Sequence, residues 1–367
     1  MSARLTYLDW NATAPILPEV AAAMADWLAR CGNASSVHRA GRAARQAVEA
    51  ARHEVAALAG APADHVTFTG SGTEANQMVL AGISGRRLVS ALEHDSLRAG
   101  PEIELIPARR DGTIDLAALE KMTEMGDSPA LVSVMFANNE TGITQPVAEA
   151  ARLAHRRGAL YHTDAVQAAG KLELRGVGAD LVTLSAHKIG GPQGVGALIA
   201  PPDLTLSPLV RGGGQERGRR AGTENVAGLV GFGIAARRAA ERAGDAAAIA
   251  ALRDEAERRL CAIAPDARIF GADAPRVANT LCIAMPRVPA ATQVMALDLA
   301  GVMVSAGAAC SSGKLRRSPV LEAMGVPPEL ADCAIRISLG WSTSAADIDH
   351  LVEAWGALYV RTKVHAA

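Results

Sequence analysis

The chain reads DLVTLSAHKIGGPQG over residues 180–194. Its first part, Asp180 to Leu184, is a short apolar run of the kind that forms a buried strand, and its second part is rich in glycine. Lys188 therefore lies just past the end of an expected strand. An amine in this setting loses solvation, its pKa falls, and it can form a Schiff base. The alternative is an ordinary strand-end lysine that points into water, and the Ser185 to Lys188 tetrapeptide alone does not decide between the two.

Two more expected strand ends carry groups that suit one cofactor. The run 160–163 leads to Asp164, whose carboxylate can keep the ring nitrogen of a pyridoxal cofactor protonated, and Gln167 can reach the ring hydroxyl. The run 66–69 leads into 70–76, which reads as a glycine turn and a helix start. Such a turn offers backbone N–H groups to a phosphate. The three strand ends together predict a site for pyridoxal 5'-phosphate.

The pattern along the chain alternates between helices and short strands. Helices are expected over 17–30 and 39–59, and strands over 66–69, 131–136, 160–163, 180–184 and 195–199. This alternation predicts an α/β fold with a parallel or mixed sheet, which binds ligands at its strand ends.

The C-terminal third predicts a second unit. Residues 226–264 are dominated by Ala, Arg, Glu and Leu and are expected to form one long helix that leaves the first domain. After it we expect a helix near 293–299 and strands over 280–285, 302–305 and 334–338, which together predict a smaller α+β domain.

Composition excludes several classes of protein. The 367 residues are 49% hydrophobic with a formal net charge of -1, so the chain can bury a large core and has no bulk charge for nucleic acid or membrane. No secretory signal and no apolar stretch of membrane-spanning length is found, and we expect a cytoplasmic protein. The scattered cysteines lack C-x-x-C spacing, which predicts free thiols rather than a disulfide framework or a zinc site. They are Cys31, Cys261, Cys282, Cys310 and Cys333.

Motifs along nearly the whole chain match one family. They are Leu8-Asp9 with Asn11-Ala12-Thr13, Gly32-Asn33 with Ser35-Ser36 and His38, Thr73 to Asn76, Glu93-His94, Asn138 to Glu140 with Gly142, Asp164 with Gln167, Ser185 to Lys188, Gly212 to Glu216, Gly222 to Asn225, the loop around Cys310, and Ile335 to Gly340. With these motifs the chain resembles the cysteine desulfurases of the NifS/IscS type, within the class V aminotransferases.

The resemblance implies a fold and a division into domains. The fold is the pyridoxal-phosphate-dependent transferase fold of type I, with a mainly parallel seven-stranded sheet in a large domain and a smaller α+β domain. The large domain is expected over 12–245, and the small domain, with the catalytic cysteine loop, over 1–11 and 246–367.

The resemblance also implies roles for individual residues. Catalytic residues are Lys188, Cys310 and His94. Cofactor-binding residues are Gly72, Thr73, His94, Asn139, Asp164, Gln167, Ser185, His187, Lys188 and, from the second subunit of a homodimer, Thr223. Asn139 and Arg336 are expected to bind the substrate, the latter through a bidentate contact with its carboxylate. For Arg336 the alternative is an internal salt bridge with an acidic residue. For His94 the alternative is a structural role.

Cys310 decides which chemistry the site performs. It lies in a run of small residues, 305–314, without an apolar period, and reactive thiols need such access. An isolated cysteine is more often a small buried hydrophobe, which is the interpretation for Cys261, Cys282 and Cys333. The basic residues Lys314, Arg316 and Arg317 either favour the thiolate and attract an acidic acceptor protein or form a solvated face. Cys310 is also a candidate transient ligand of an iron–sulfur cluster.

The expected reaction converts L-cysteine to L-alanine. Lys188, once freed from the cofactor, takes the substrate α-proton, and the Cys310 thiolate attacks the substrate sulfur to leave an enzyme persulfide. His94 helps to move protons, including that of the substrate thiol. The persulfide then supplies sulfur for iron–sulfur cluster assembly or other thiolation.

The sequence departs from the family pattern in a few places. Trp10 stands where relatives usually have a small polar residue, Gly70 to Gly72 shifts the usual Thr-Ser-Gly-Ala, and Gln77 replaces a common asparagine. The chain ends 31 residues after Arg336 (367 minus 336), without the longer tail with which housekeeping members dock a scaffold. The acceptor is therefore left open between a nitrogen-fixation scaffold, a housekeeping scaffold bound differently, and a sulfur carrier for thiolation.

Rival functions remain at this stage. The segment 70–75 after a strand also fits the loose dinucleotide fingerprint, with Glu93 as the ribose acid, which would make the protein a nicotinamide oxidoreductase. That alternative leaves Asp164, Lys188 and Cys310 without a role. A selenocysteine lyase, or a C–S lyase that releases sulfide directly, keeps the cofactor but does not need the thiol of Cys310. A purely scaffolding protein is the third class.

Overall fold

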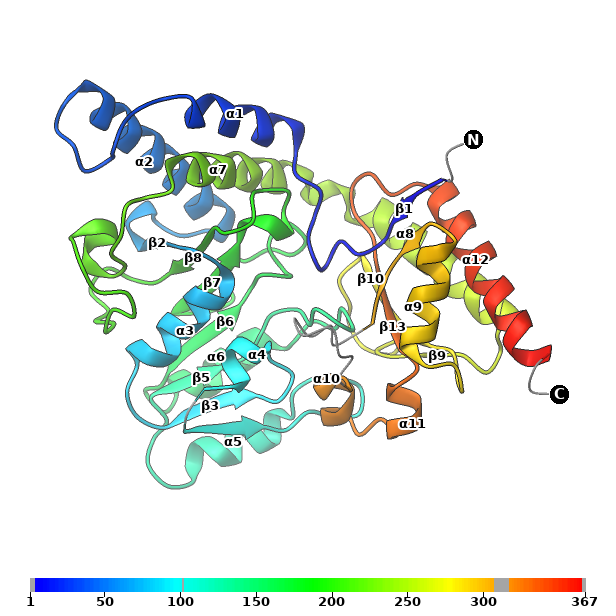
Figure 1. Cartoon of the computed structure of the whole chain (residues 1–367). Coiled ribbons are helices and arrows are strands. Elements are labelled where there is room, and N and C mark those ends of the chain that lie inside the picture. The colour runs from blue at the N-terminus through cyan, green and yellow to red at the C-terminus, as the bar shows by residue number, and fades with distance from the viewer. Residues whose placement is uncertain (1–3, 101, 307–316, 365–367) are drawn as a thin grey trace.

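A mainly parallel sheet of seven strands forms the centre of the larger lobe (Figure 1). The computed structural model describes residues 4–100, 102–306 and 317–364, so Cys310, Lys314 and Arg316 lie outside the described residues. The strand order is β2 (Val66–Thr69), β8 (Gly196–Ile199), β7 (Leu181–Ser185), β6 (Leu160–Asp164), β5 (Leu131–Ser133), β3 (Arg87–Ser90) and β4 (Ile103–Ile106). Only β8 runs antiparallel to its neighbours. The predicted sheet is confirmed.

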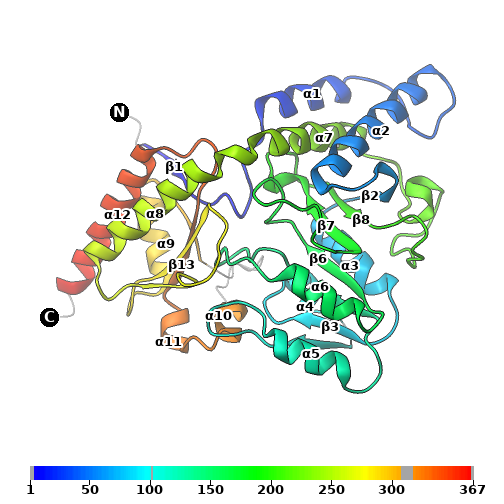
Figure 2. The same cartoon turned by 180° about the vertical axis from the view of Figure 1, so that it is seen from behind.

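Helices cover both faces of this sheet (Figures 1 and 2). One face carries α1 (Pro18–Leu28), α2 (Arg39–Ala59), α5 (Leu116–Glu124), α6 (Val147–His155) and α7 (Val226–Glu241), and the other carries α3 (Gly72–Gly82) and α4 (Asp95–Arg98). Neighbouring strand residues point to opposite faces. Val182 thus belongs to the core under α2 and α7, whereas Leu181 belongs to the core under α3.

The bounds of α2 show how local sequence sets an element. The helix begins after His38, whose ring nitrogen accepts a hydrogen bond from the backbone N–H of Gly41 at 3.3 Å. It ends at Gly60, which adopts the left-handed conformation with φ of 68°. The apolar stripe between them, including Val48 and Val55, is buried against the sheet.

A second, antiparallel sheet lies in the smaller lobe. Its order is β12 (Ser305–Ala306), β13 (Ala334–Ser338), β10 (Thr280–Ala284) and β9 (Arg268–Ile269). Against it pack α8 (Ala246–Ile263), α9 (Ala290–Leu299) and α12 (Ala345–Val364). The short helices α10 (Pro319–Ala323) and α11 (Pro328–Ala331) lie at the lower end of the smaller lobe in Figure 1, with α10 on the side of the larger lobe.

The start of the chain lies against this smaller sheet. Strand β1 (Thr6–Tyr7) pairs in parallel with β11 (Val302–Met303), and Asp9 forms a bridge with Ser338. The division into a large domain over 12–245 and a small domain over 1–11 and 246–367 stays a prediction.

Several predicted elements are wrong in detail. The single helix over 226–264 is divided by a 3-10 turn over Arg242–Asp245, which contains Gly244, a residue that weakens helices. The strand over 302–305 splits into β11 and β12 because its two halves pair with different strands. The strand over 131–136 ends at Ser133, although the N–H groups of Val134 and Phe136 still bond to β6. Strands β3 and β4 were not predicted.

Among the described residues, no helix combines the length and apolar character that a membrane crossing requires.

Candidate functional site

A cavity of about 380 Å³ lies where the carboxyl ends of β6 and β7 meet the N-terminal segment and β13. The predicted site residues that line it are Gly72, Thr73, His94, Asn139, Asp164, Gln167, Ser185, His187, Lys188 and Arg336. Residues from both lobes therefore surround one space. Parallel α/β sheets place their ligands at this edge.

The predicted phosphate turn is the start of α3. Ser71 caps this helix by accepting a hydrogen bond from the N–H of Glu74 at 3.1 Å, which leaves the N–H groups of Gly72 and Thr73 for a ligand. The turn packs tightly on β8, because a Cβ on Gly196 would lie 2.5 Å from the carbonyl carbon of Ser71. A larger residue at Gly196 would push the turn into the cavity.

Lys188 projects from a 3-10 turn that follows β7 directly. Its Nζ donates to the carbonyl oxygens of Asn11 at 2.6 Å and of Ala12 at 2.8 Å. Burial, together with the positive charge of Arg336, lowers the pKa of Lys188 to about 8. The amine is thus much closer to losing its proton at neutral pH than an exposed lysine is.

Asp164 ends β6 and is held by hydrogen bonds on both oxygens. One oxygen accepts from the side-chain nitrogen of Asn76 at 2.7 Å, and the other accepts from the backbone N–H of Val166 at 2.9 Å. Asn76 also donates to Ser96, whose hydroxyl lies 2.8 Å from Nδ1 of His94. The carboxylate and the histidine are therefore parts of one network.

Glu93 is buried behind this network. Its Oε1 accepts a hydrogen bond of 3.4 Å from Ser133, and its Oε2 has no partner among the described residues. Burial, and next the negative charge of Asp164, raise the pKa of Glu93 well above its usual value. Because Glu93 is buried, it cannot serve as the ribose acid of a dinucleotide site.

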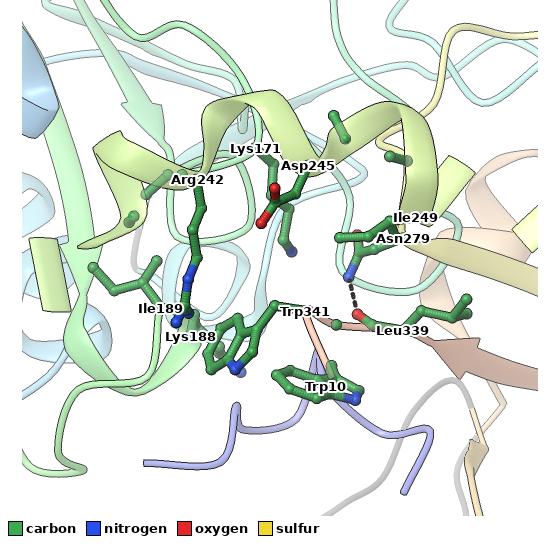
Figure 3. Close-up of a pocket in the computed structure, with 16 residues that line it drawn as sticks. Trp10, Lys171, Lys188, Ile189, Arg242, Asp245, Ile249, Asn279, Leu339 and Trp341 are labelled. Carbon is green, nitrogen blue, oxygen red and sulfur yellow. Dashed lines mark hydrogen bonds between the residues drawn. The ribbon is translucent and has the colours of Figure 1, made fainter. Parts of the chain in front are cut away.

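Gln167 lines the main cavity and contacts Lys171, which lines a second cavity of about 80 Å³ shown in Figure 3, and Lys188 lines both cavities. Its amide nitrogen donates to the carbonyl oxygen of Asn11 at 2.9 Å, and its oxygen accepts from Nζ of Lys171 at 3.1 Å. Lys171 lines the second cavity, and burial, with the charge of Lys188, lowers its pKa to about 7. These two contacts fix which way the Gln167 amide faces.

Two tryptophans line the same second cavity. Trp10 and Trp341 meet edge to face with ring centroids 4.6 Å apart, and the Arg242 guanidinium lies 4.5 Å from the Trp341 ring centroid (Figure 3). Trp10 leaves no room for a side chain at Gly340, where a Cβ would lie 2.0 Å from the indole. The unusual residue at position 10 therefore packs behind the site rather than blocking it.

Arg336 makes the internal salt bridge that was the alternative to substrate binding. Its Nη2 donates to the Asp9 carboxylate at 2.7 Å, and its Nη1 donates to the carbonyl oxygen of Asn139 at 3.0 Å. Its Nε is buried without a partner among the described residues. One side of the guanidinium therefore has no acceptor of its own.

His187 and Ser185 lie beside the Lys188 turn. Nδ1 of His187 is 3.2 Å from the hydroxyl of Thr13. Burial, with the charge of Lys188, lowers the pKa of His187 to about 4, so its ring is neutral at neutral pH. Ser185, at the end of β7, is buried.

One predicted cofactor-binding residue, Thr223, does not line the cavity. Thr223 is exposed in the loop before α7 and does not line the cavity of its own chain. Cys310 lies outside the described residues.

Cys282 and Cys333 are buried as predicted, whereas Cys261 is only partly buried, so the prediction of a fully buried thiol is wrong there. No disulfide joins the cysteines within the described part of the chain.

Several residues that line the cavity were not predicted to have a function. Asp9, Asn11 and Asn76 lie in the matched motifs and line the cavity, and Ser71 and Ser96 line it too. Asn11 binds the polar groups of both lobes, since its side chain bonds to Asn139, Thr280 and Asn279. For Asp9, Asn11 and Asn76 only their position in the motifs signalled a role, and Ser96 lies in none of these motifs.

The chain matches the family model described as "Aminotransferase class-V" over residues 6–351. It is 46% identical to a cysteine desulfurase of Cereibacter sphaeroides, covering 95% of this chain and 94% of the relative. It is 38% identical to the cysteine desulfurase IscS of Dictyoglomus turgidum, covering 95% and 93%. The X-ray structure of a NifS-like protein from Rickettsia africae superposes with a TM-score of 0.91 at 34% identity, covering 97% of this chain and 99% of that one.

Proposed function

The chain belongs to the class V aminotransferases, among their cysteine desulfurases, and we propose that Lys188 and Asp164 hold its pyridoxal 5'-phosphate while Cys310 receives the sulfur. Proteins of this family generally depend on this cofactor. When bound, it supplies an aldehyde that joins amines and a protonated ring that accepts electrons. The observation that carries the proposal is the meeting of Lys188, Asp164 and the α3 turn in one cavity.

The residues of the cavity fit this cofactor. The start of α3, with Ser185 and the neutral His187, suits a phosphate, since the helix N-terminus offers N–H groups. Asp164 suits a protonated ring nitrogen, and the amide of Gln167 suits the ring hydroxyl. The orphaned Oδ1 of Asn76 shows that this end of the cavity still has an acceptor to satisfy. We assign the ring face to His94 and a contact to ring and substrate to Asn139.

Lys188 is suited to carry the cofactor and then to move a proton. Its pKa of about 8 makes the neutral amine accessible near neutral pH. The carbonyl groups of Asn11 and Ala12 hold the amine when it is not engaged. Once free, Lys188 can take the α-proton of the substrate, whose carboxylate we assign to Arg336.

The sulfur step balances within one substrate and one thiol. The bond between Cβ and sulfur of L-cysteine breaks, a sulfur–sulfur bond forms to Cys310, and the carbon fragment keeps the electron pair and gains a proton. The products are L-alanine and the Cys310 persulfide. Ser305 lines the cavity, and five residues extended span at most about 18 Å, so the chain length lets Cys310 reach it.

A homodimer completes the proposal. Thr223 lies outside the cavity of its own chain, and we assign it to the phosphate in the cavity of a second copy. The sulfur then passes to an acceptor protein such as an iron–sulfur scaffold, and Cys310 would ligate a cluster only transiently.

Borohydride trapping tests the cofactor assignment. Among the described residues, the lysines with lowered pKa values are Lys188, at about 8, and Lys171, at about 7, and of these Lys188 lines the main cavity. Reduction of the protein loaded with pyridoxal phosphate should fix the cofactor to the Lys188 peptide, as read by mass spectrometry. Lys171→Met is the matched control and should still be labelled at Lys188, whereas Lys188→Ala should lose the label. Labelling at Lys171 instead would overturn the assignment.

A further inference from the structure

The buried guanidinium of Arg336 is already in contact with a carboxylate of the same chain, that of Asp9. The side chain of Arg336 is 6% exposed and that of Asp9 is 21% exposed. Their contact is a single 2.7 Å hydrogen bond from Nη2 to Oδ1, and Nε of Arg336 has no acceptor. A buried guanidinium needs a negative partner, and in the absence of substrate Asp9 supplies it.

The backbone around Asp9 is fixed, while its carboxylate faces the cavity. The carbonyl oxygen of Asp9 accepts hydrogen bonds from the N–H of Ala12 at 3.0 Å and from the hydroxyl of Tyr7 at 3.0 Å. Asp9 also forms the bridge to Ser338, and its side chain lines the cavity. Rotation of the side chain alone can therefore move the carboxylate away from Arg336 without disturbing the chain.

Because of these contacts, the Asp9 carboxylate competes with the substrate carboxylate for the guanidinium of Arg336. An amino-acid carboxylate that binds Arg336 brings a second negative charge to a guanidinium that is already paired. The two carboxylates repel each other, so Asp9 must share the guanidinium or leave it.

We propose that Asp9 sets substrate affinity by occupying Arg336 with its own carboxylate until the carboxylate of an amino acid replaces it. This inference rests on the proposed function, which assigns the substrate carboxylate to Arg336. It explains why a buried arginine is charge-paired with a carboxylate of its own chain. It also means that part of the binding free energy of each substrate is spent in displacing Asp9.

The test is the affinity of the cofactor-loaded protein for two carboxylates that have no sulfur to transfer, L-alanine and propionate. Asp9→Asn keeps a hydrogen-bond acceptor and removes the charge. It should bind L-alanine roughly two- to fivefold more tightly in calorimetry, the effect of one partly exposed ion pair. Propionate, which has no amine and so responds to the carboxylate site alone, should gain by the same factor as a competitor. Asp9→Glu should behave as wild type. The matched control is Asp347→Asn. Asp347 lies outside the cavity, and the substitution removes its ion pair with Arg4, which belongs to the same N-terminal segment as Asp9.

The outcomes separate this inference from the function on which it rests. Equal or weaker binding by Asp9→Asn would show that Asp9 only orients Arg336, and the inference would be wrong. A gain for L-alanine without a gain for propionate would place the effect at Lys188 and would also overturn it. If Arg336→Lys bound both ligands as wild type does, the carboxylate site of the proposed function would fail as well.

Discussion

Asn76 donates a hydrogen bond of 2.7 Å from its side-chain nitrogen to the carboxylate of Asp164. These residues are 88 positions apart and meet because α3 begins beside the end of β6. The contact holds the carboxylate that we assign to the cofactor ring, while burial raises the pKa of Glu93 behind it well above its usual value.

Asp164→Asn should bind the cofactor but react slowly. The substitution keeps the shape and removes the charge that stabilises a protonated ring, so alanine formation should fall roughly a hundredfold or more. Glu93→Gln is the matched control, because burial already raises the pKa of Glu93 and favours its neutral form, and its rate should stay near that of wild type. Initial rates at equal cofactor content measure both. Equal losses in the two variants would contradict the assignment of Asp164.

Lys171 should make the stability of the protein depend on pH. Its pKa is about 7 in the folded chain and 10.5 as a free side chain, so between these values the unfolded chain binds the extra proton. Stability therefore rises as pH increases from about 7 towards 10.5, and the cost of Lys171 is largest below pH 7.

Lys171→Met should accordingly gain stability over wild type at pH 7 and lose most of that advantage by pH 10. Urea unfolding at the two pH values measures this difference. Lys363→Met is the control, since Lys363 is exposed and paired with Asp266, and it should show no gain at pH 7. An advantage of Lys171→Met that did not change with pH would mean that the burial of the charge is not the cause.

Mixed dimers should reveal whether Thr223 acts across subunits. Lys188→Ala and Thr223→Asp should each be nearly inactive alone, the second because its carboxylate repels the phosphate. Mixing equal amounts after unfolding and refolding should restore about a quarter of wild-type activity, because half of the dimers are mixed and each has one complete site. A mixture that stays inactive while the refolded wild type recovers would place Thr223 in the site of its own chain.

Arg52→Met should destabilise the loop that carries Thr223. Arg52 on α2 makes a two-pronged ion pair with Glu216 at 2.8 and 2.9 Å, and both side chains are buried. Without Arg52 the Glu216 carboxylate would keep only the hydrogen bond from the backbone N–H of Phe68 and no cation, which should lower the free energy of unfolding by about 3–5 kcal/mol. Arg237→Met removes the exposed ion pair between Arg237 on α7 and Glu54 on α2. It should lower the free energy of unfolding by less than about 1 kcal/mol. Denaturant unfolding compares the two variants, and similar small losses would show that the buried pair adds nothing.

Short-range patterns predicted the parts of the fold that local chemistry determines. The bounds of α2 and β2 were predicted at the residues observed, since a capping His38 and a Gly60 stop bracket the helix. The break between α7 and α8 was missed because a run rich in alanine and arginine continues through it, with Gly244 as the only interruption. Strand β4 was missed because it lies at the edge of the sheet with Glu104 and Leu105 exposed, so it lacks the apolar run of a buried strand, and its neighbour β3 was missed with it.

The candidate site was predictable where a motif residue faces the ligand, and not where two distant residues meet. Lys188, Asp164 and Gln167 follow strands, so their place at the sheet edge could be inferred from the chain itself. The contact of Asp9 with Arg336 joins residues 327 positions apart, and the contact of Asn76 with Asp164 depends on the packing of α3. Sequence spacing carries no information about such pairs.

The most direct test of the account is the reaction with L-cysteine in the absence of added reductant. Wild type and Cys310→Ala, at equal cofactor content, are assayed for alanine and for persulfide bound to the protein. We expect wild type to form both products and Cys310→Ala to form neither. If the variant made alanine at the wild-type rate and wild type held no persulfide, direct release of sulfide would be the correct reaction, and the sulfur-transfer role of Cys310 would be wrong.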